Sequence, residues 1–288
     1  MSRSGSQLVA LAIASWPLAG CLGTPTPLAP GLAGSIGVPH DGVQTGAAEL
    51  PVRGPGFVRY RPHTPNDWAN PKLVHAVEQA AATVARKRPG GAPLVIGDMS
   101  ARYGGDIPGH ASHEDGRDAD LLWYVTTPAG APVQNPGFIH MGSDGLADVV
   151  GRSGFLRLDV AREWLLVKTL LQSPDIGVEW MFCARPVEAL IIDYARARDE
   201  DPALLWHAET VLQQPGDSAP HDDHIHLRMA CTGDLAVHGC EGGGPYWDWL
   251  PPQPALGPLD RATLESIAGD DPLAIERTGA GSNAGNGA

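Results

Sequence analysis

The chain has 288 residues, of which 43% are hydrophobic, so it can form one substantial domain with tails or two small domains. Its formal net charge of -13, with only 20 Lys and Arg residues and no basic stripe, argues against nucleic-acid binding. The 36 Gly and 27 Pro residues are concentrated at the ends and in connecting stretches, which indicates long irregular segments around a compact middle.

Residues 1–20 have the anatomy of a secretion signal. Arg3 provides a positive charge, residues 8–18 form an apolar run too short to span a bilayer permanently, and small residues follow. Residues 18–21, Leu-Ala-Gly-Cys, resemble a bacterial lipobox, which implies a lipid on Cys21 and a membrane attachment. Ordinary signal cleavage with an incidental cysteine is the alternative. Either process exports the chain, so we expect it in the periplasm or cell envelope.

The rest of the chain divides into a tether, a folded domain and a tail. Residues 21–50 are rich in Pro, Gly and small residues, which favours a flexible linker. Periodic apolar residues predict helices from Pro71 to the Pro-Gly-Gly at 89–91 and over 158–171, 187–197 and 202–213. Apolar or alternating runs predict strands over 94–96, 119–125, 178–183 and 224–229. This order predicts an α+β domain over residues 51–250, with a small antiparallel sheet and flanking helices, followed by a Pro/Gly-rich tail over 251–288.

Export changes how the four cysteines are interpreted. If Cys21 carries a lipid, Cys231 and Cys240 are the nearest remaining pair, and an oxidising compartment allows them to close a small loop. Cys183 lies in an apolar run, where we expect a buried, inert thiol. The sequence has no CxxC pair, so a cysteine-ligated zinc or a thioredoxin-type redox site is not expected.

Two short windows, residues 109–120 and 220–228, contain five of the eleven histidines. His224 and His226 are two residues apart in a predicted strand and so face the same side, while His113 and Asp120 flank a turn that contains glycine. Imidazole and carboxylate are ligands that zinc selects, and three protein ligands with an open fourth position are typical of catalytic zinc. The windows therefore predict a Zn²⁺ site that can activate water for amide hydrolysis.

Four segments resemble the penicillin-insensitive murein endopeptidases. They are Gly-Asp-Met-Ser at 97–100, Pro-Gly-His-Ala-Ser-His at 108–113, Gly-Arg-Asp-Ala-Asp at 116–120 and His-Asp-Asp-His-Ile-His-Leu-Arg at 221–228. The pattern His113-x6-Asp120 followed by His224-x-His226 is also similar to the zinc signature of lysostaphin-type and D-Ala-D-Ala peptidases. The likeness extends over about residues 50–250, with Cys231 just after the last segment as in that family. It implies a zinc peptidase with a hedgehog/D-Ala-D-Ala peptidase-like fold.

The resemblance assigns roles to these histidines and to Asp120. It implies that His113, Asp120 and His226 hold the zinc ion. His224 would act as general base or would stabilise the tetrahedral intermediate, and His221 would assist it. Hydrogen bonding that orients the ligands is an alternative role for His221.

His110 is implied to be a further metal-binding residue. In the family it can contribute to a second metal position, together with an Asp and a His further along the chain. Asp144 matches that Asp, but Ala147 stands in the place of the His, which puts a second zinc in doubt. As for His221, orientation of the other ligands is the alternative role of His110.

Other side chains near the windows have more than one interpretation. Arg228 shares a strand face with His226 and could hold either a substrate carboxylate or an Asp. The acidic pair Glu114-Asp115 is predicted to lie in a solvated turn. Trp247, Trp249 and Tyr246 could form a rim that stacks on glycan, or could pack against the core.

The activity implied by the resemblance is hydrolysis of peptidoglycan cross-links at the amide bond between D-alanine and meso-diaminopimelate. One alternative is a zinc D,D- or L,D-carboxypeptidase or dipeptidase that acts on muropeptides. A second is a non-catalytic lipoprotein that binds the cell wall. In each case the expected partner is peptidoglycan.

Overall fold

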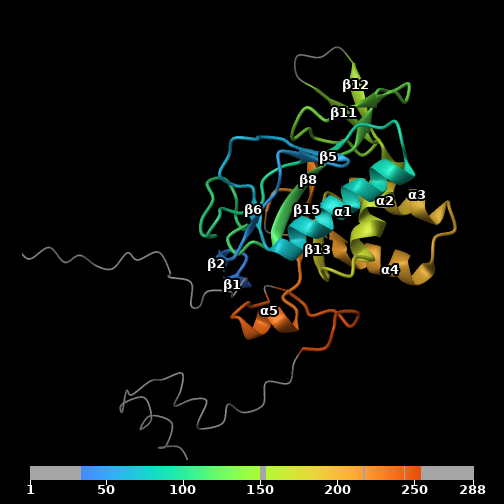
Figure 1. Cartoon of the computed structure of the whole chain (residues 1–288). Coiled ribbons are helices and arrows are strands. Elements are labelled where there is room, and N and C mark those ends of the chain that lie inside the picture. Colours follow the sequence, from blue (N-terminus) through green and yellow to red (C-terminus); the bar gives the residue numbers. More distant parts are fainter. Residues whose placement is uncertain (1–33, 150–153, 217, 243, 254–288) are drawn as a thin grey trace, which may run out of the picture. The chain divides into compact units, whose positions relative to one another are not determined.

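The computed structural model describes residues 34–149, 154–216, 218–242 and 244–253, and its centre is a seven-stranded mixed sheet (Figure 1). In sheet order the strands are β14 (Leu212–Gln213), β13 (Val178–Phe182), β15 (His224–Met229), β8 (Asp118–Leu122), β7 (Leu94–Ile96), β5 (Phe57–Arg59) and β4 (Arg53–Gly54). The predicted signal, the lipobox with Cys21 and residues 254–288 of the predicted tail lie outside the described residues.

The four strands predicted from the sequence are the middle of this sheet. β13, β15, β8 and β7 are consecutive neighbours, and each pair is antiparallel. The prediction of a small, wholly antiparallel sheet is wrong at the edges, where β14 and β5 add parallel pairs with β13 and β7. Because these edge strands have only two or three residues, they are too short to give a readable alternation of apolar residues.

Three smaller sheets surround the main one. The first pairs β1 (Gly34–Val38) with β2 (Asp41–Thr45), the second pairs β3 (Ala48–Glu49) with β6 (Trp68–Ala69), and the third contains β10 (Pro132–Val133), β9 (Val125–Thr126), β12 (Phe155–Leu158) and β11 (Leu146–Asp148). The β1–β2 hairpin lies inside the stretch predicted to be a flexible linker, so that prediction is wrong for residues 34–50. Its glycines serve the hairpin: Gly37 has φ +78 and pairs with Gly42.

Five helices complete the described residues. They are α1 (Pro71–Lys87), α2 (Val160–Leu171), α3 (Arg185–Arg196), α4 (Pro202–Val211) and the short α5 (Gly233–Val237). The start of α1 agrees with the sequence signal, because the Asn70 side chain accepts the N–H of Lys72 and Pro71 occupies the first turn. The predicted mixed α+β class is confirmed, with β12, β14 and the other short strands added.

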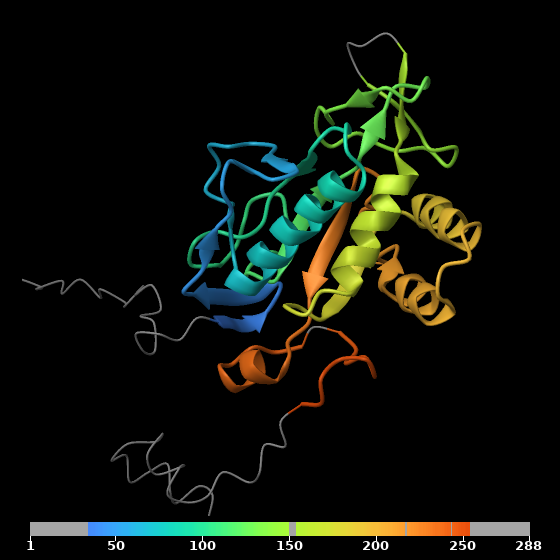
Figure 2. The same cartoon turned by 45° about the vertical axis from the view of Figure 1, so that its right-hand side comes forward.

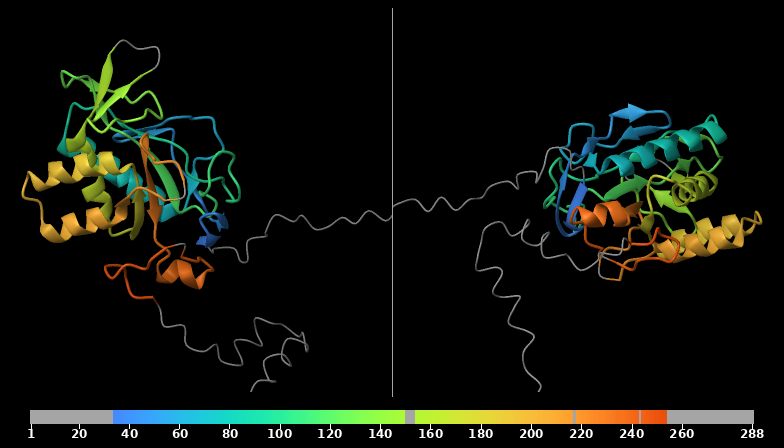
Figure 3. Two further views of the ribbon diagram at one scale, coloured as in Figure 1. Left: turned by 180° about the vertical axis from the view of Figure 1, so that it is seen from behind. Right: turned by 60° about the horizontal axis from the view of Figure 1, so that its bottom comes forward.

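Helices α1 and α2 lie side by side across one face of the main sheet (Figure 2). Their apolar stripes and the sheet form the core, where Leu73, Val77, Leu121 and Leu227 have no more than 1% of their surface exposed. The view from behind shows β8 and β15 from the face that α1 and α2 do not cover (Figure 3, left). That second face is where polar side chains of these strands can meet.

The disulfide prediction is confirmed: Cys231 and Cys240 are bonded, and Cys183 is buried and free. The disulfide closes a loop that contains α5, which lies beside β1 (Figure 3, right). The backbones of Gly37 and Cys240 form an isolated β-bridge. Among the described residues, none of the helices has the length and apolar character needed to cross a membrane.

Candidate metal centre

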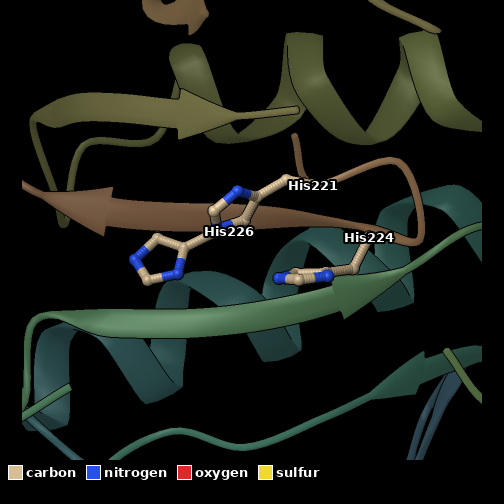
Figure 4. Close-up of side chains that lie close together, drawn as sticks. All are labelled: His221, His224 and His226. Atoms are coloured by element: carbon tan, nitrogen blue, oxygen red, sulfur yellow. The ribbon is translucent and has the colours of Figure 1, made fainter. Parts of the chain in front are cut away.

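The strand register brings the two histidine windows together. β8 and β15 pair so that Asp120 lies opposite His226. Strand alternation buries Ile225 and Leu227 against the helices and turns His224 and His226 to the other face. Figure 4 shows these two imidazoles in front of β15, with α1 behind the sheet.

A single carboxylate oxygen is the meeting point of three imidazoles. Asp120 Oδ1 lies 3.3 Å from His113 Nε2, 3.2 Å from His224 Nε2 and 3.4 Å from His226 Nδ1. Burial opposes ionisation of Asp120, but its histidine neighbours outweigh this and hold its pKa well below the usual value. The carboxylate is therefore ionised and available as a ligand.

His113 is fixed by the loop that carries it. Its Nδ1 lies 2.6 Å from the carbonyl oxygen of Met99, and its backbone N–H donates to Asp118 Oδ2 at 2.9 Å. Because a carbonyl can only accept, Nδ1 carries the proton and the lone pair of Nε2 points at Asp120. His113 also has φ +77, a left-handed conformation that is uncommon outside glycine and is held here by these two bonds.

Asp118, which is buried, and Arg228, which is partly buried, form an ion pair beneath His226. Arg228 donates to both carboxylate oxygens of Asp118, at 2.7 and 3.1 Å. Asp118 Oδ1 also lies 3.3 Å from His226 Nε2. Burial raises the pKa of Asp118, yet Arg228 and His226 outweigh it and keep that pKa well below the usual value. Of the two partners considered for Arg228, the structure therefore favours an Asp.

His224 is held in place from its other ring nitrogen. Its Nδ1 donates to Asp223 Oδ1 at 2.6 Å, and its ring meets the Phe138 ring edge-on at 5.2 Å between centroids. Burial would lower the pKa of His224, but the carboxylates of Asp120 and Asp223 outweigh it and raise that pKa to about 10. Asp223 belongs to the segment that resembles the family, but no local signal in the sequence indicates this contact.

His221 lies in the loop before β15, with its ring 5.0 Å from that of His224 and 5.6 Å from that of His226 between centroids (Figure 4). It has φ +53, and its Nδ1 donates to the carbonyl of Ala219 at 2.7 Å. Burial, aided by the two neighbouring histidines, lowers the pKa of His221 to about 4. His221 is therefore neutral at pH 7.

His110 lies between two carboxylates, those of Asp98 and Asp120. Its Nδ1 is 4.0 Å from Asp120 Oδ2, and its Nε2 is 3.1 Å from Asp98 Oδ2. Asp144, which the resemblance suggested as the second-metal Asp, forms a turn in which its Oδ1 accepts the N–H of Leu146 at 3.0 Å.

The donor set fits a metal ion. Two groups of three side chains have their donor atoms within 4.8 Å of one another: His110, His113 and Asp120, and His221, His224 and His226. His113 Nε2 and Asp120 Oδ1 are buried without a hydrogen-bond partner, a costly arrangement unless a cation satisfies both. A tetrahedral zinc with bonds of about 2.0–2.1 Å separates its ligand atoms by roughly 3.3 Å. The contacts at Asp120 Oδ1 have this spacing.

A cleft of about 1140 Å³ opens over the cluster. Besides the histidines, Phe138, Trp180 and Phe182 line it, as does His140, whose Nδ1 lies 2.7 Å from Asp222 Oδ1. Sequence reasoning missed these four side chains. Trp180 and Phe182 alternate along a predicted strand, so the sequence indicates that they share one face of it. Their place in the cleft follows only once this strand is known to be the neighbour of β15.

The prediction of a solvated turn is wrong for Asp115. It is fully buried, and its Oδ2 accepts from Arg117 Nε at 2.7 Å. Arg117 is also buried and lies 3.4 Å from Glu179 Oε2 on β13. Turn composition could not reveal this burial, because Glu179, the residue that contacts Arg117, lies in a strand more than sixty positions later.

Comparison with known proteins gives consistent matches. A family model described as penicillin-insensitive murein endopeptidase matches residues 35–136. The penicillin-insensitive murein endopeptidase of Haemophilus influenzae is 26% identical over 233 residues, covering 77% of this chain and 71% of that protein. The protein of the same name from Escherichia coli strain K12 is 26% identical over 284 residues, covering 91% of this chain and 94% of its own.

An α+β fold with clustered imidazoles and carboxylates in a cleft, together with these relatives, defines a hydrolase of the peptidase class. The family model and these relatives support the penicillin-insensitive murein endopeptidase family as the one that this chain resembles.

Proposed function

We propose that this protein is a zinc-dependent endopeptidase that hydrolyses the amide bond between D-alanine and meso-diaminopimelate in peptidoglycan cross-links. The names of its relatives support peptidoglycan as the substrate. The observation that carries the metal assignment is the buried and unpartnered pair of His113 Nε2 and Asp120 Oδ1, 3.3 Å apart. His226 Nδ1, 3.4 Å from the same oxygen, is the third proposed ligand.

A zinc ion held by these residues would supply a Lewis acid that activates water and polarises the scissile carbonyl. The protein contributes the fixed orientation of each donor. Met99 sets the tautomer of His113, and Asp118, which is bonded to Arg228, lies 3.3 Å from the far nitrogen of His226. His110 is proposed as an additional ligand or as a group that orients Asp120.

His224 is proposed to move the proton. Its Nδ1–H is bound to Asp223, so Nε2 is the atom that faces the cluster. Without a proton on Nε2, the imidazole accepts one from the attacking water; with it, the imidazolium donates a hydrogen bond to the oxyanion or a proton to the leaving amine. His221, neutral and beside His224, is proposed to assist through the lone pair of its Nε2, because its N–H at Nδ1 is already donated to the Ala219 carbonyl.

The pairing of Arg228 with Asp118 favours an endopeptidase over a carboxypeptidase. An enzyme that removes a terminal residue benefits from a free cation for the substrate carboxylate. Among the described residues that line the cleft, Arg228 is the lone Arg or Lys, and it is already bonded to both oxygens of Asp118. The cleft thus lacks a ready anchor for a chain end.

We also propose that the mature protein is held in the periplasm by a lipid on Cys21, on the basis of the lipobox-like residues 18–21. Metabolic labelling with a fatty-acid analogue tests this: wild type should carry the label and Cys21→Ala should not. Label on neither protein would remove the anchor from the proposal without touching the catalytic site.

The proposed activity is tested with the purified mature chain and isolated sacculi. Zinc-loaded protein should convert cross-linked muropeptide dimers into monomers, detected by mass spectrometry, and a chelator should stop the conversion. Loss of terminal alanine alone would indicate a carboxypeptidase, and binding without products would indicate the non-catalytic alternative.

The zinc assignment has its own readout. His226→Ala should bind less zinc by elemental analysis and lose activity, whereas His75→Ala should match wild type because His75 is exposed on α1 and pairs with Asp175. Full zinc content and full activity in His226→Ala would overturn the ligand set.

A further inference from the structure

Beside the histidine cluster, a row of aromatic side chains extends from β13 to residues 244–253, which we call the C-terminal segment, and on to α4. Neighbouring ring centroids lie 5.4 Å apart for Phe182 and Trp180, 5.0 Å for Trp180 and Trp247, 5.1 Å for Trp247 and Trp249, and 5.1 Å for Trp249 and Trp206. The five side chains come from three separate segments of the chain. We refer to Phe182, Trp180, Trp247, Trp249 and Trp206 as the aromatic row.

The row begins at the metal centre. On β13, Phe182 pairs with His226 and Trp180 pairs with Arg228, and the Phe182 ring lies 5.8 Å from that of His226 between centroids. Phe182 and Trp180 both line the catalytic cleft. The row is therefore continuous with the proposed site of hydrolysis.

The row is not closed off as a core would be, although Trp249 packs against the core and its indole N–H is buried. All five side chains remain at least partly accessible, and Trp206 at the far end is 56% exposed. Within the described residues the indole N–H of Trp180 has no hydrogen-bond partner, while that of Trp247 donates to the Glu179 carbonyl at 2.8 Å. Such a surface offers apolar ring faces together with a free donor at the edge of the cleft.

The geometry points to a carbohydrate site: the aromatic row stacks on the sugar rings of the glycan strand whose peptide enters the cleft. This inference rests on the proposed function and names the part of the substrate that the row recognises. The C–H groups on one face of a pyranose ring are apolar and slightly positive, and they suit the negative face of an indole. A neutral partner of this kind needs no cation, in keeping with the net charge of -13.

The spacing is compatible with a peptide attached to a sugar. An extended stem of three to four residues reaches about 10–14 Å from sugar to scissile bond. Phe182 is next to His226, and Trp180 and Trp247 follow in successive steps of 5.4 and 5.0 Å. A sugar on the outer rings of the row thus lies within reach of a peptide that occupies the cleft.

The alternative is that the row only packs the C-terminal segment against the domain. Two substrates separate these roles: cross-linked dimers that carry disaccharides, and the same cross-linked peptides after enzymatic removal of the sugars. If the row binds sugar, Trp180→Ala should lower kcat/KM by about tenfold or more on the sugar-bearing dimer and by less than about twofold on the sugar-free peptide. Equal losses on both substrates, or no loss on either, would overturn the inference.

Trp206→Ala provides a second variant at a side chain that is largely exposed, so the core is left intact. It should weaken activity on sacculi, where the glycan is long, more than activity on the short dimer. Phe155→Ala is the matched control, because Phe155 is 51% exposed on β12 and lies outside the row and the cleft lining. Unchanged activity of Trp206→Ala on sacculi would limit the site to the rings nearer the cleft and contradict the continuous row.

Direct binding distinguishes this inference from the proposed function. A tetramer of β-1,4-linked N-acetylglucosamine, titrated against full-length His226→Ala and followed by tryptophan fluorescence, should bind, and the His226→Ala, Trp180→Ala double variant should not. Sugar binding without cleavage of any cross-linked substrate by the wild type would leave the site standing and reject the endopeptidase. Cleavage by the wild type without sugar binding would reject the sugar site and leave the endopeptidase activity standing.

Discussion

At the scale of single residues, Asp118 supports the metal centre without being one of its proposed ligands. It accepts the backbone N–H of His113, faces the far nitrogen of His226 and is bonded twice by Arg228. Asp118→Asn keeps the shape but removes the negative charge that orients these groups. We expect zinc affinity to fall by about 10–100-fold.

The measurement for Asp118→Asn is competition against a chelator of known zinc affinity. Asp201→Asn is a suitable control, because Asp201 caps α4. Unchanged affinity in Asp118→Asn would show that the pair with Arg228 serves the fold alone. Circular dichroism separates a loss of affinity from a loss of structure.

The raised pKa of Glu163 on α2 makes the stability of the protein depend on pH. It is 1% exposed and accepts the backbone N–H of Tyr124, and burial raises its pKa to about 8. An unfolded chain has a Glu pKa of about 4.3, so between roughly pH 4 and pH 8 the unfolded state releases a proton that the folded state keeps. This residue therefore lowers the free energy of unfolding as the pH rises through that window.

Glu163→Gln removes the titrating group and keeps an acceptor for Tyr124. The advantage of Glu163→Gln over wild type in free energy of unfolding should grow by about 3–4 kcal/mol from pH 5 to pH 8. Urea denaturation at several pH values measures this, with Glu78→Gln on α1 as the control. Parallel pH profiles for wild type and Glu163→Gln would contradict the raised pKa.

At the scale of elements, the central strands were predictable because each has a local signal. Strand 224–229 alternates cleanly, which was enough to place His224 and His226 on one face. The alternation says nothing about neighbours, so the pairing of Phe182 with His226 could not be read from the sequence. For the same reason Gly34–Val38 was assigned to a linker, although its partner Asp41–Thr45 follows directly.

The proposed ligand set has clearer signals in the sequence than the residues around it have. His113 and Asp120 belong to a recognisable motif, whereas Asp223, Phe138 and Trp180 act through contacts that only the folded chain creates. Asp115 shows the same limit, because its buried partner Arg117 is stabilised by Glu179 from a distant strand. Motifs identify the chemistry, while tertiary pairing determines its supports.

The disulfide connects the end of β15 to α5 and through Cys240 to β1. Its loop spans a sequence separation of 9, for which loop-closure entropy gives about 2–3 kcal/mol. A Cys231→Ala, Cys240→Ala variant should lose that amount in urea denaturation, and a reductant should lower wild type to the same midpoint without affecting the variant. Equal midpoints for oxidised wild type and variant would mean that the bond adds no stability.

At the scale of the whole molecule, net charge determines how the protein approaches its substrate. A chain with a net charge of -13 is repelled by an anionic cell wall, and this repulsion weakens as salt shortens the Debye length. Stacking of sugar on the aromatic row is not ionic and should be little affected by salt. The two effects together predict the salt dependence of binding to sacculi.

Association of the full chain with sacculi should stay constant or strengthen between about 0.05 and 0.3 M salt. A co-sedimentation assay with His226→Ala measures this without cleavage of the wall. A protein held to the wall by lysines and arginines would show the opposite trend, with binding lost as counterions compete. Such a loss here would mean that a local basic surface, and not the aromatic row, dominates attachment, because the net charge alone cannot produce it.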